Sequence, residues 1–146
     1  MCLTTSNPVT QLAEKPIQVW KRLIKTDNGF KTPYQYVAVK VNESLKALYP
    51  DAKVRGNPYF PEHIVDIQGV HAYITQDKAE INKCSNEVIT EWEIPAGAKY
   101  WIGDECSLGE IAATEMKFIK VCKEKKIVFF DEKSGKHWTI STVLKD

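Results

Sequence analysis

Hydrophobic and polar residues alternate over short segments along most of this chain, which is the period-2 pattern of half-buried β-strands. Residues 87–94 show it most clearly, because Val88, Thr90, Trp92 and Ile94 share one face of an extended segment. We expect the last three segments of this kind to pair as a meander. The pattern predicts strands over residues 17–25, 36–41, 63–67, 70–74, 87–94, 99–102, 111–113, 116–121, 127–130 and 137–143.

One strand leads directly into a helical pattern. Residues 75–83 follow the strand over residues 70–74, and Thr75 can accept a backbone hydrogen bond as the N-cap. Gly69, before that strand, indicates a tight turn with positive φ. A further helical turn or two is expected at residues 44–48. The pattern as a whole predicts an α+β fold, with a small, twisted, mostly antiparallel split sheet in two parts and one main helix packed on it.

Length and composition narrow the class of protein. A chain of 146 residues with 43% hydrophobic residues predicts one domain over 1–146, with an irregular N-terminal arm over 1–15. The net charge of +1 argues against a dedicated nucleic-acid or membrane-surface protein. The absence of a long apolar run and of a signal peptide indicates a cytoplasmic location. The four cysteines are scattered and far from the histidines, so no metal site is expected.

Candidate chemistry begins with two strand positions. His71 and Tyr73 project from the same face of their strand, just before a helix N-terminus, and could form the floor of a polar ligand site. The alternative is a strand with two half-buried polar aromatic side chains. Arg22 shares a face of the first strand with Trp20 and Ile24, so its guanidinium needs an anionic partner. That partner is either a carboxylate, in a structural ion pair, or a phosphate of a ligand.

A glutamate completes the candidate site. Glu110 follows Gly109 and opens a strand after an acidic loop, so its carboxylate could reach into a cleft beside the loop. Crowding with Asp104 and Glu105 would raise the pKa of one of these carboxyl groups. The alternative is a solvated acidic loop. Exposed aromatic rings could stack on a planar ligand, the candidates being Tyr34, Tyr36, Tyr59 and Phe60.

The order of these features resembles the ADP-ribosyltransferase-like fold. A first strand carries an Arg, a Gly-x-His-x-Tyr strand opens into a helix containing Lys-Ala, and a later Glu opens a strand, over residues 17–121. The resemblance implies a cleft for NAD or an ADP-ribose-like nucleotide. It gives Arg22 the first-strand role, His71 and Tyr73 the central-strand role, and Glu110 the catalytic role. The family's Ser-x-Ser and paired Glu-x-Glu motifs are absent, so the fold could persist without the transferase reaction.

A second resemblance is to small uncharacterised proteins of bacteriophages and their Bacteroidetes-type hosts. It rests on the start Met-Cys-Leu-Thr-Thr, on Gly-x-His-Ala-Tyr and on Ile-Pro-x-Gly-x-Lys-Tyr. It implies a phage or mobile-element protein in the bacterial cytoplasm, acting as a counter-defence factor with a host defence protein as partner. The function predicted is binding of a NAD- or ADP-ribose-type nucleotide. The alternatives are an active ADP-ribosyltransferase and a protein-interaction module without a small ligand.

Overall fold

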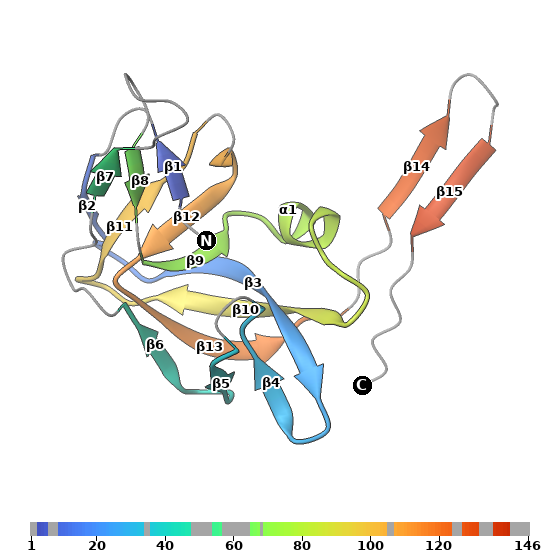
Figure 1. The fold of residues 1–146 in the computed structure, drawn as a ribbon, viewed down its shortest axis with the longest axis horizontal. Helices are drawn as coiled ribbons and strands as arrows, with labels where there is room; N and C mark the ends of the chain where they lie inside the picture. The colour runs from blue at the N-terminus through green and yellow to red at the C-terminus, as the bar shows by residue number, and fades with distance from the viewer. Residues whose placement is uncertain are drawn as a thin grey trace.

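Antiparallel strands make up most of the described chain (Figure 1). A computed structural model describes residues 3–5, 9–33, 36–47, 54–56, 65–67, 69–104, 107–123, 127–131 and 136–140. Its α-helix is α1 (Gln76–Ile81). The strands are β1 (Leu3–Thr5), β2 (Gln11–Leu12), β3 (Ile17–Thr26), β4 (Gly29–Lys31), β5 (Ala38–Val39), β6 (Ser44–Lys46), β7 (Val54–Gly56), β8 (Val65–Ile67), β9 (Val70–Tyr73), β10 (Glu87–Ile94), β11 (Lys99–Ile102), β12 (Glu110–Ala113), β13 (Glu115–Val121), β14 (Ile127–Asp131) and β15 (Lys136–Ile140).

Three sheets contain these strands. The largest has ten strands, in the order β2-β11-β12-β9-β3-β10-β13-β6, with β4 beside β3 and β5 beside β4. A three-stranded sheet has the order β1-β8-β7, and β14 pairs with β15. The registered strand pairs are all antiparallel. The predicted mostly antiparallel sheet with one main helix is therefore confirmed. The helix is shorter than expected, so the fold is consistent with a small α+β or a mostly-β class, and the described strands form three sheets rather than two.

The ten-stranded sheet consists of two halves with a narrow joint. On one side of the joint, β9 pairs with β12 over four residues, from Tyr73 opposite Glu110 to Val70 opposite Ala113. On the other side, β3 pairs with β10 over eight residues. Between the halves, β3 and β9 share a single residue pair, Trp20 with Tyr73. We call this pair the joint.

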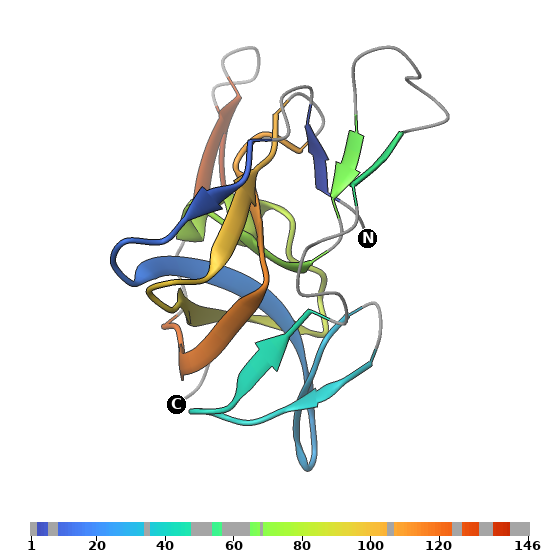
Figure 2. The same ribbon diagram turned by 90° about the vertical axis from the view of Figure 1, so that its left-hand side faces the viewer.

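The ribbon of the ten-stranded sheet is strongly bent (Figure 2). The main core lies on the face that carries Val19 and Leu23 of β3. Trp92 and Phe118, on neighbouring strands, stack with ring centroids 5.0 Å apart and planes inclined by 13°. The indole nitrogen of Trp92 donates to the hydroxyl of Thr90 at 2.8 Å, so the ring is buried without an unsatisfied donor. The predicted apolar face of β10 therefore packs into the core.

The start of the helix follows the prediction, and the turn before β9 does not. The Thr75 hydroxyl accepts from the backbone N–H of Lys78 at 3.2 Å, which confirms the predicted N-cap. Gly69 does not have the positive φ that was expected. It is required for close approach instead, because a Cβ there would lie 3.0 Å from the carbonyl oxygen of Ala113. This contact brings the start of β9 against the end of β12.

Two local predictions were wrong because distant strands decide the conformation. The helical turn expected at residues 44–48 is the strand β6, since Ser44–Lys46 pairs with residues 115–117 of β13. The expected meander is only a hairpin of β14 and β15, because β13 pairs with β10 and β6. Strand β13 buries Met116 and Phe118 in the main core, which fixes it there.

Other predicted segments differ in extent from the observed ones. The strand expected over residues 36–41 is limited to β5, because Tyr36 has a φ of 53° and leaves the extended conformation. The arm over residues 1–15 contains the strands β1 and β2. Residues 63–64 and 141–143 of predicted strands lie outside the described residues. Within the described chain, no helix has the length and apolar character needed to cross a membrane.

Lys21 is a partly buried amine next to the joint. Its Nζ donates to the backbone oxygen of His71 and lies 5.7 Å from the centroid of the Trp92 ring. These contacts tie β3 to β9 beyond their single residue pair. Burial and, to a smaller extent, the charge of Arg22 together lower the pKa of Lys21 to about 8.

Replacing Lys21 with Met, which keeps the unbranched stem and removes the charge, tests this burial. Between pH 8 and 10.5 the unfolded chain holds a proton that folded Lys21 has released, so the stability due to this group rises with pH. We expect the free energy of unfolding of the unmodified chain to rise across this window relative to Lys21→Met. Urea unfolding curves at several pH values measure the difference. A difference that is constant with pH would contradict the assignment.

Candidate functional site

The predicted site residues project from one face of the ten-stranded sheet. Directly paired residues of antiparallel strands point to the same side, and Tyr73 is opposite Glu110 in β12 and opposite Trp20 in β3. Arg22 and His71 lie two positions along their strands and therefore share this side. The guanidinium carbon of Arg22 is 5.9 Å from the centroid of the Tyr73 ring. The face carries a row of side chains, Glu110, Tyr73 and Trp20, which we call the joint row.

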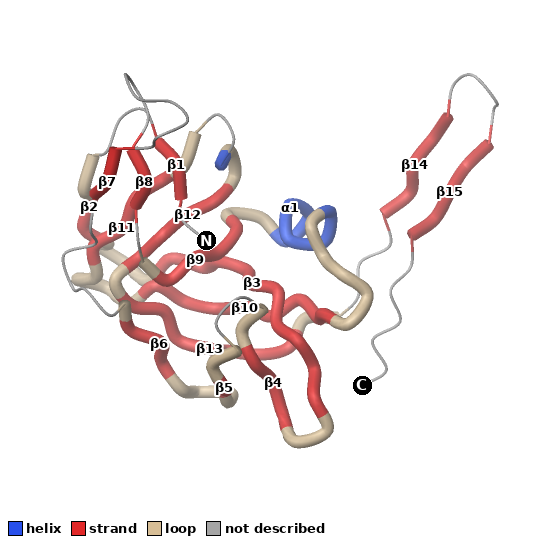
Figure 3. The backbone as a smooth tube through the Cα atoms, in the orientation of Figure 1, coloured by secondary structure: helices blue, strands red, loops and turns tan. Residues whose placement is uncertain are grey.

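Helix α1 packs against β3 and β9 (Figure 3). Through Ala79 it covers Tyr73, the middle of the joint row. Under the helix, Tyr73 packs with Ala79, Ile89 and Cys122, and Trp20 borders this small core. The Tyr73 residue is only 7% exposed. Its ring is therefore part of a second core on the far side of the sheet from the main one, and it has no open face on which a ligand could stack while the helix is in place.

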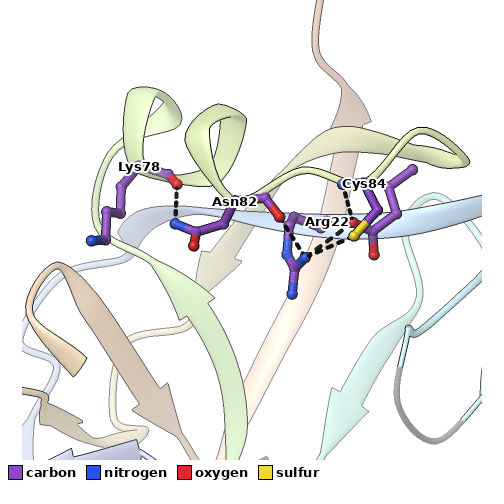
Figure 4. Close-up of polar contacts among 5 residues, drawn as sticks. Arg22, Lys78, Asn82 and Cys84 are labelled. Carbon is purple, nitrogen blue, oxygen red and sulfur yellow. Dashed lines mark hydrogen bonds and ion pairs between the residues drawn. The ribbon is translucent and has the colours of Figure 1, made fainter. Parts of the chain in front are cut away.

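Arg22 connects β3 to the segment that follows the helix (Figure 4). Its Nη1 donates to the backbone oxygen of Asn82 at 2.6 Å and to Glu87 Oε1 at 3.1 Å, and lies 3.9 Å from Cys84 Sγ. Glu87 Oε1 also accepts from the backbone N–H of Cys84 at 2.7 Å. The two charged side chains are 10% and 3% exposed. Of the two partners considered for Arg22, the structure provides the carboxylate.

Glu110 lies at the open end of the joint row, where the loop before β12 meets the helix. Gly109 has a φ of +83°, and a Cβ there would be 3.2 Å from Lys78 Cγ, so the stem of Lys78 crosses over this glycine. Burial raises the pKa of the Glu110 carboxyl. The charge of Lys78, a hydrogen bond from Ser107 and the charge of Arg22 oppose this rise. The carboxylate and the Lys78 ammonium therefore belong to one partly buried polar cluster.

The carboxyl group with a raised pKa beside this loop is Glu110, and burial is the main cause. The expected cause was crowding between Asp104 and Glu105. Glu105, the other expected neighbour, lies outside the described residues, as do Tyr34, Tyr59 and Phe60. Tyr36 is exposed, as a stacking residue would need, but the Lys31 ammonium lies 4.8 Å from the centroid of its ring.

His71 lies at the other end of the same face. It is opposite Ala112, which packs with Leu3 and Trp101 in a third cluster. Burial and, after it, the charge of Lys21 contribute to lowering the pKa of His71 to about 3. The imidazole is therefore neutral at neutral pH. Its Nε2 is buried without a hydrogen-bond partner in the part of the chain that the structure describes.

Sequence reasoning missed the residues that complete the polar cluster. Lys78 and Ser107 approach Glu110 from the helix and from the loop. The first turn of the helix was predicted, but which strand the helix would lie against was not visible in its pattern. Among the described residues no group of His, Cys, Asp and Glu side chains could hold a metal ion.

Searches against models of protein families, against curated proteins and against solved structures found no match to this chain. The candidate site is therefore argued from its own geometry.

Replacing Arg22 with Met should destabilise the fold strongly. The change leaves the buried Glu87 carboxylate without its cation, and removing one partner of a buried pair costs about 3–5 kcal/mol. Urea unfolding measures the loss. The matched control is Lys46→Met, because the Lys46–Glu115 pair is 4.0 Å long with side chains 74% and 32% exposed. Such an exposed pair is worth less than about 1 kcal/mol. Equal losses in the two variants would contradict the role assigned to Arg22.

His71 should make the fold sensitive to acid. Its pKa is about 3 in the folded chain and near 6.5 when unfolded, so between these values only the unfolded state holds the proton. The stability due to His71 is therefore lost as the pH falls through this window. We expect the unmodified chain to lose more stability than His71→Gln between pH 6.5 and pH 4 in urea unfolding. Parallel pH profiles for the two proteins would show that His71 is not buried in its neutral form.

Proposed function

We propose that this chain binds a nucleotide of the NAD or ADP-ribose kind, at the end of the joint row where α1 meets β12. The observation that carries the proposal is that the charge of Lys78, on the helix, acts on the Glu110 carboxylate, which shares a face of the sheet with Arg22 and Tyr73. Cation and carboxylate are both only partly buried, so a ligand can reach them from solvent. The joint row extends from this point under the helix.

The chemistry of the cluster suits a ribose joined to a diphosphate. A carboxylate is an acceptor with two oxygens and can bind the paired hydroxyl groups of a ribose. The Lys78 ammonium is a compact charge with three donors and can bind a phosphate oxygen. The charges of Lys78 and Arg22 both oppose the rise of the Glu110 pKa, so both cations act at this point of the surface, although burial outweighs them.

This assignment changes the roles that the resemblance to ADP-ribosyltransferases implied. Arg22 already donates hydrogen bonds to Glu87 and to the backbone of Asn82. In the proposal, Lys78 therefore makes the phosphate contact. Tyr73 supports the site from beneath the helix. Glu110 keeps its place at the ribose. The resemblance to small phage proteins extends the proposal to a counter-defence factor, which would withhold such a nucleotide from a host defence system.

Thermal unfolding with a panel of NAD, ADP-ribose and ADP tests the proposal. A ligand that binds only the native state stabilises it by about 2.7 kcal/mol at 100 times its Kd, so the Tm should rise. We expect Glu110→Gln and Lys78→Met to abolish the shift and Lys46→Met to retain it. Tyr73→Phe should retain most of it, whereas Tyr73→Ala would also open the small core. No shift with any of the three compounds would contradict nucleotide binding.

The same samples separate binding from catalysis. Release of nicotinamide from NAD, lost in Glu110→Gln, would show an active ADP-ribosyltransferase in which the carboxylate stabilises the positive charge that develops on the ribose. A Tm shift without nicotinamide release supports the binding protein.

A protein-interaction role is the second candidate, favoured by exposed apolar side chains beside the same site. Ile74 is 37% exposed and Leu108 is 68% exposed. They lie close together, because the backbone N–H of Ile74 donates to the oxygen of Gly109 at 2.9 Å. Capture of a protein partner that is lost in Ile74→Ser with Leu108→Ser, without any nucleotide response, would favour this candidate.

A further inference from the structure

We infer that helix α1 is a lid, which opens while the sheet beneath it stays folded and so admits ligand to the joint row. This inference rests on the proposed function for its biological meaning, but the motion can be measured without any ligand.

The apolar contact that holds α1 in place is small. Of its six residues, Ala79 is the apolar one that is buried, and the carboxylate-bearing Glu80 is buried beside it. Ile81, the larger apolar residue of the helix, is 62% exposed. Hydrophobic stabilisation scales with the apolar area removed from water on both partners. The helix itself supplies little more than an alanine methyl to that area, and the rest is the part of Tyr73 and Cys122 that it covers. A helix of this length is also too short to be stable without its tertiary contacts.

Two polar contacts tie the ends of the helix to other parts of the fold. At the N-terminal end, Gln76 Nε2 donates to the backbone oxygen of Lys123 at 3.2 Å, whereas the Thr75 cap bond lies within the helix itself. At the C-terminal end, Arg22 holds Asn82 through its backbone oxygen. Water can replace such bonds when they open, so each contributes a modest net free energy. The lid can therefore separate from the sheet at a cost well below that of unfolding the main core.

Opening would uncover the residues that the closed helix hides. Ala79 of the helix packs in one buried cluster with Tyr73 and Cys122, and Trp20 packs against this cluster. The aromatic row would then become accessible from the side where Glu110 and Lys78 already meet solvent.

Cys122 offers a natural probe of the motion. It is buried under the lid, and burial raises the pKa of its thiol to about 11, with the charge of Glu91 adding to the rise. The closed thiol is therefore a poor nucleophile, since the thiolate is the reacting species. In a chain with Cys2, Cys84 and Cys106 replaced by Ser, any reaction with Ellman's reagent reports Cys122 alone.

The rate of labelling as a function of urea tests the lid. We expect a rate that is nearly independent of urea below the unfolding transition and faster than global unfolding permits, because a local opening exposes little surface. Thr75→Ala removes only the helix cap and should accelerate labelling about three- to ten-fold. The matched control is Thr26→Ala, which removes a similar hydroxyl bond, to the oxygen of Gly29 at 3.0 Å, in the β3–β4 hairpin. It should leave the rate unchanged.

A labelling rate that equals the global unfolding rate, and rises steeply from the lowest urea concentration, would overturn the lid. So would equal acceleration by Thr75→Ala and Thr26→Ala. Adding ADP-ribose to the same assay separates the two proposals. If the ligand has no effect on a local, cap-sensitive opening, the lid stands and the proposed function fails.

Discussion

The pairing of Trp20 with Tyr73 is the contact on which the arrangement of this molecule depends. It is the single residue pair through which β3 and β9 join the two halves of the ten-stranded sheet. On one face of the sheet the halves share the main core. On the other face the joint row of Glu110, Tyr73 and Trp20 crosses from one half to the other, covered in its middle by α1.

Two cationic side chains of β3, Lys21 and Arg22, make contacts on the two faces of the sheet beside this narrow joint. Lys21 reaches from β3 to the backbone of His71 on the core side. Arg22 reaches from the next position of β3 to the end of α1 on the opposite side. Two neighbouring cations of β3 therefore connect this strand to β9 on one face and to the end of α1 on the other, and both are partly buried. The pKa of Lys21 is lowered in part by Arg22, so the electrostatics of the two faces are coupled.

Much of the fold was predictable from local pattern. Strands β3 and β10 and the Thr75 cap have period-2 or capping signals that agree with the tertiary structure, and β11 and β12 were predicted close to their observed bounds. The common face of His71 and Tyr73 follows from strand periodicity alone. Glu110 and Tyr73 are brought together by register, which two isolated segments do not specify. The choice of Glu87 for Arg22 and the approach of Lys78 to Glu110 also depend on non-local packing. The pairing of β6 with β13 overrode a helical pattern for the same reason.

The central claim is that α1 closes over the joint row as a separate unit of stability. Native-state hydrogen exchange tests it most directly, by comparing the Ala79 amide, which donates to Thr75 at 3.3 Å, with the β10 amides that pair with β3. The account predicts that Ala79 exchanges through a low-energy opening with little dependence on denaturant, while the β10 amides exchange only through global unfolding. Equal exchange free energies and equal denaturant dependence for the two groups would contradict it.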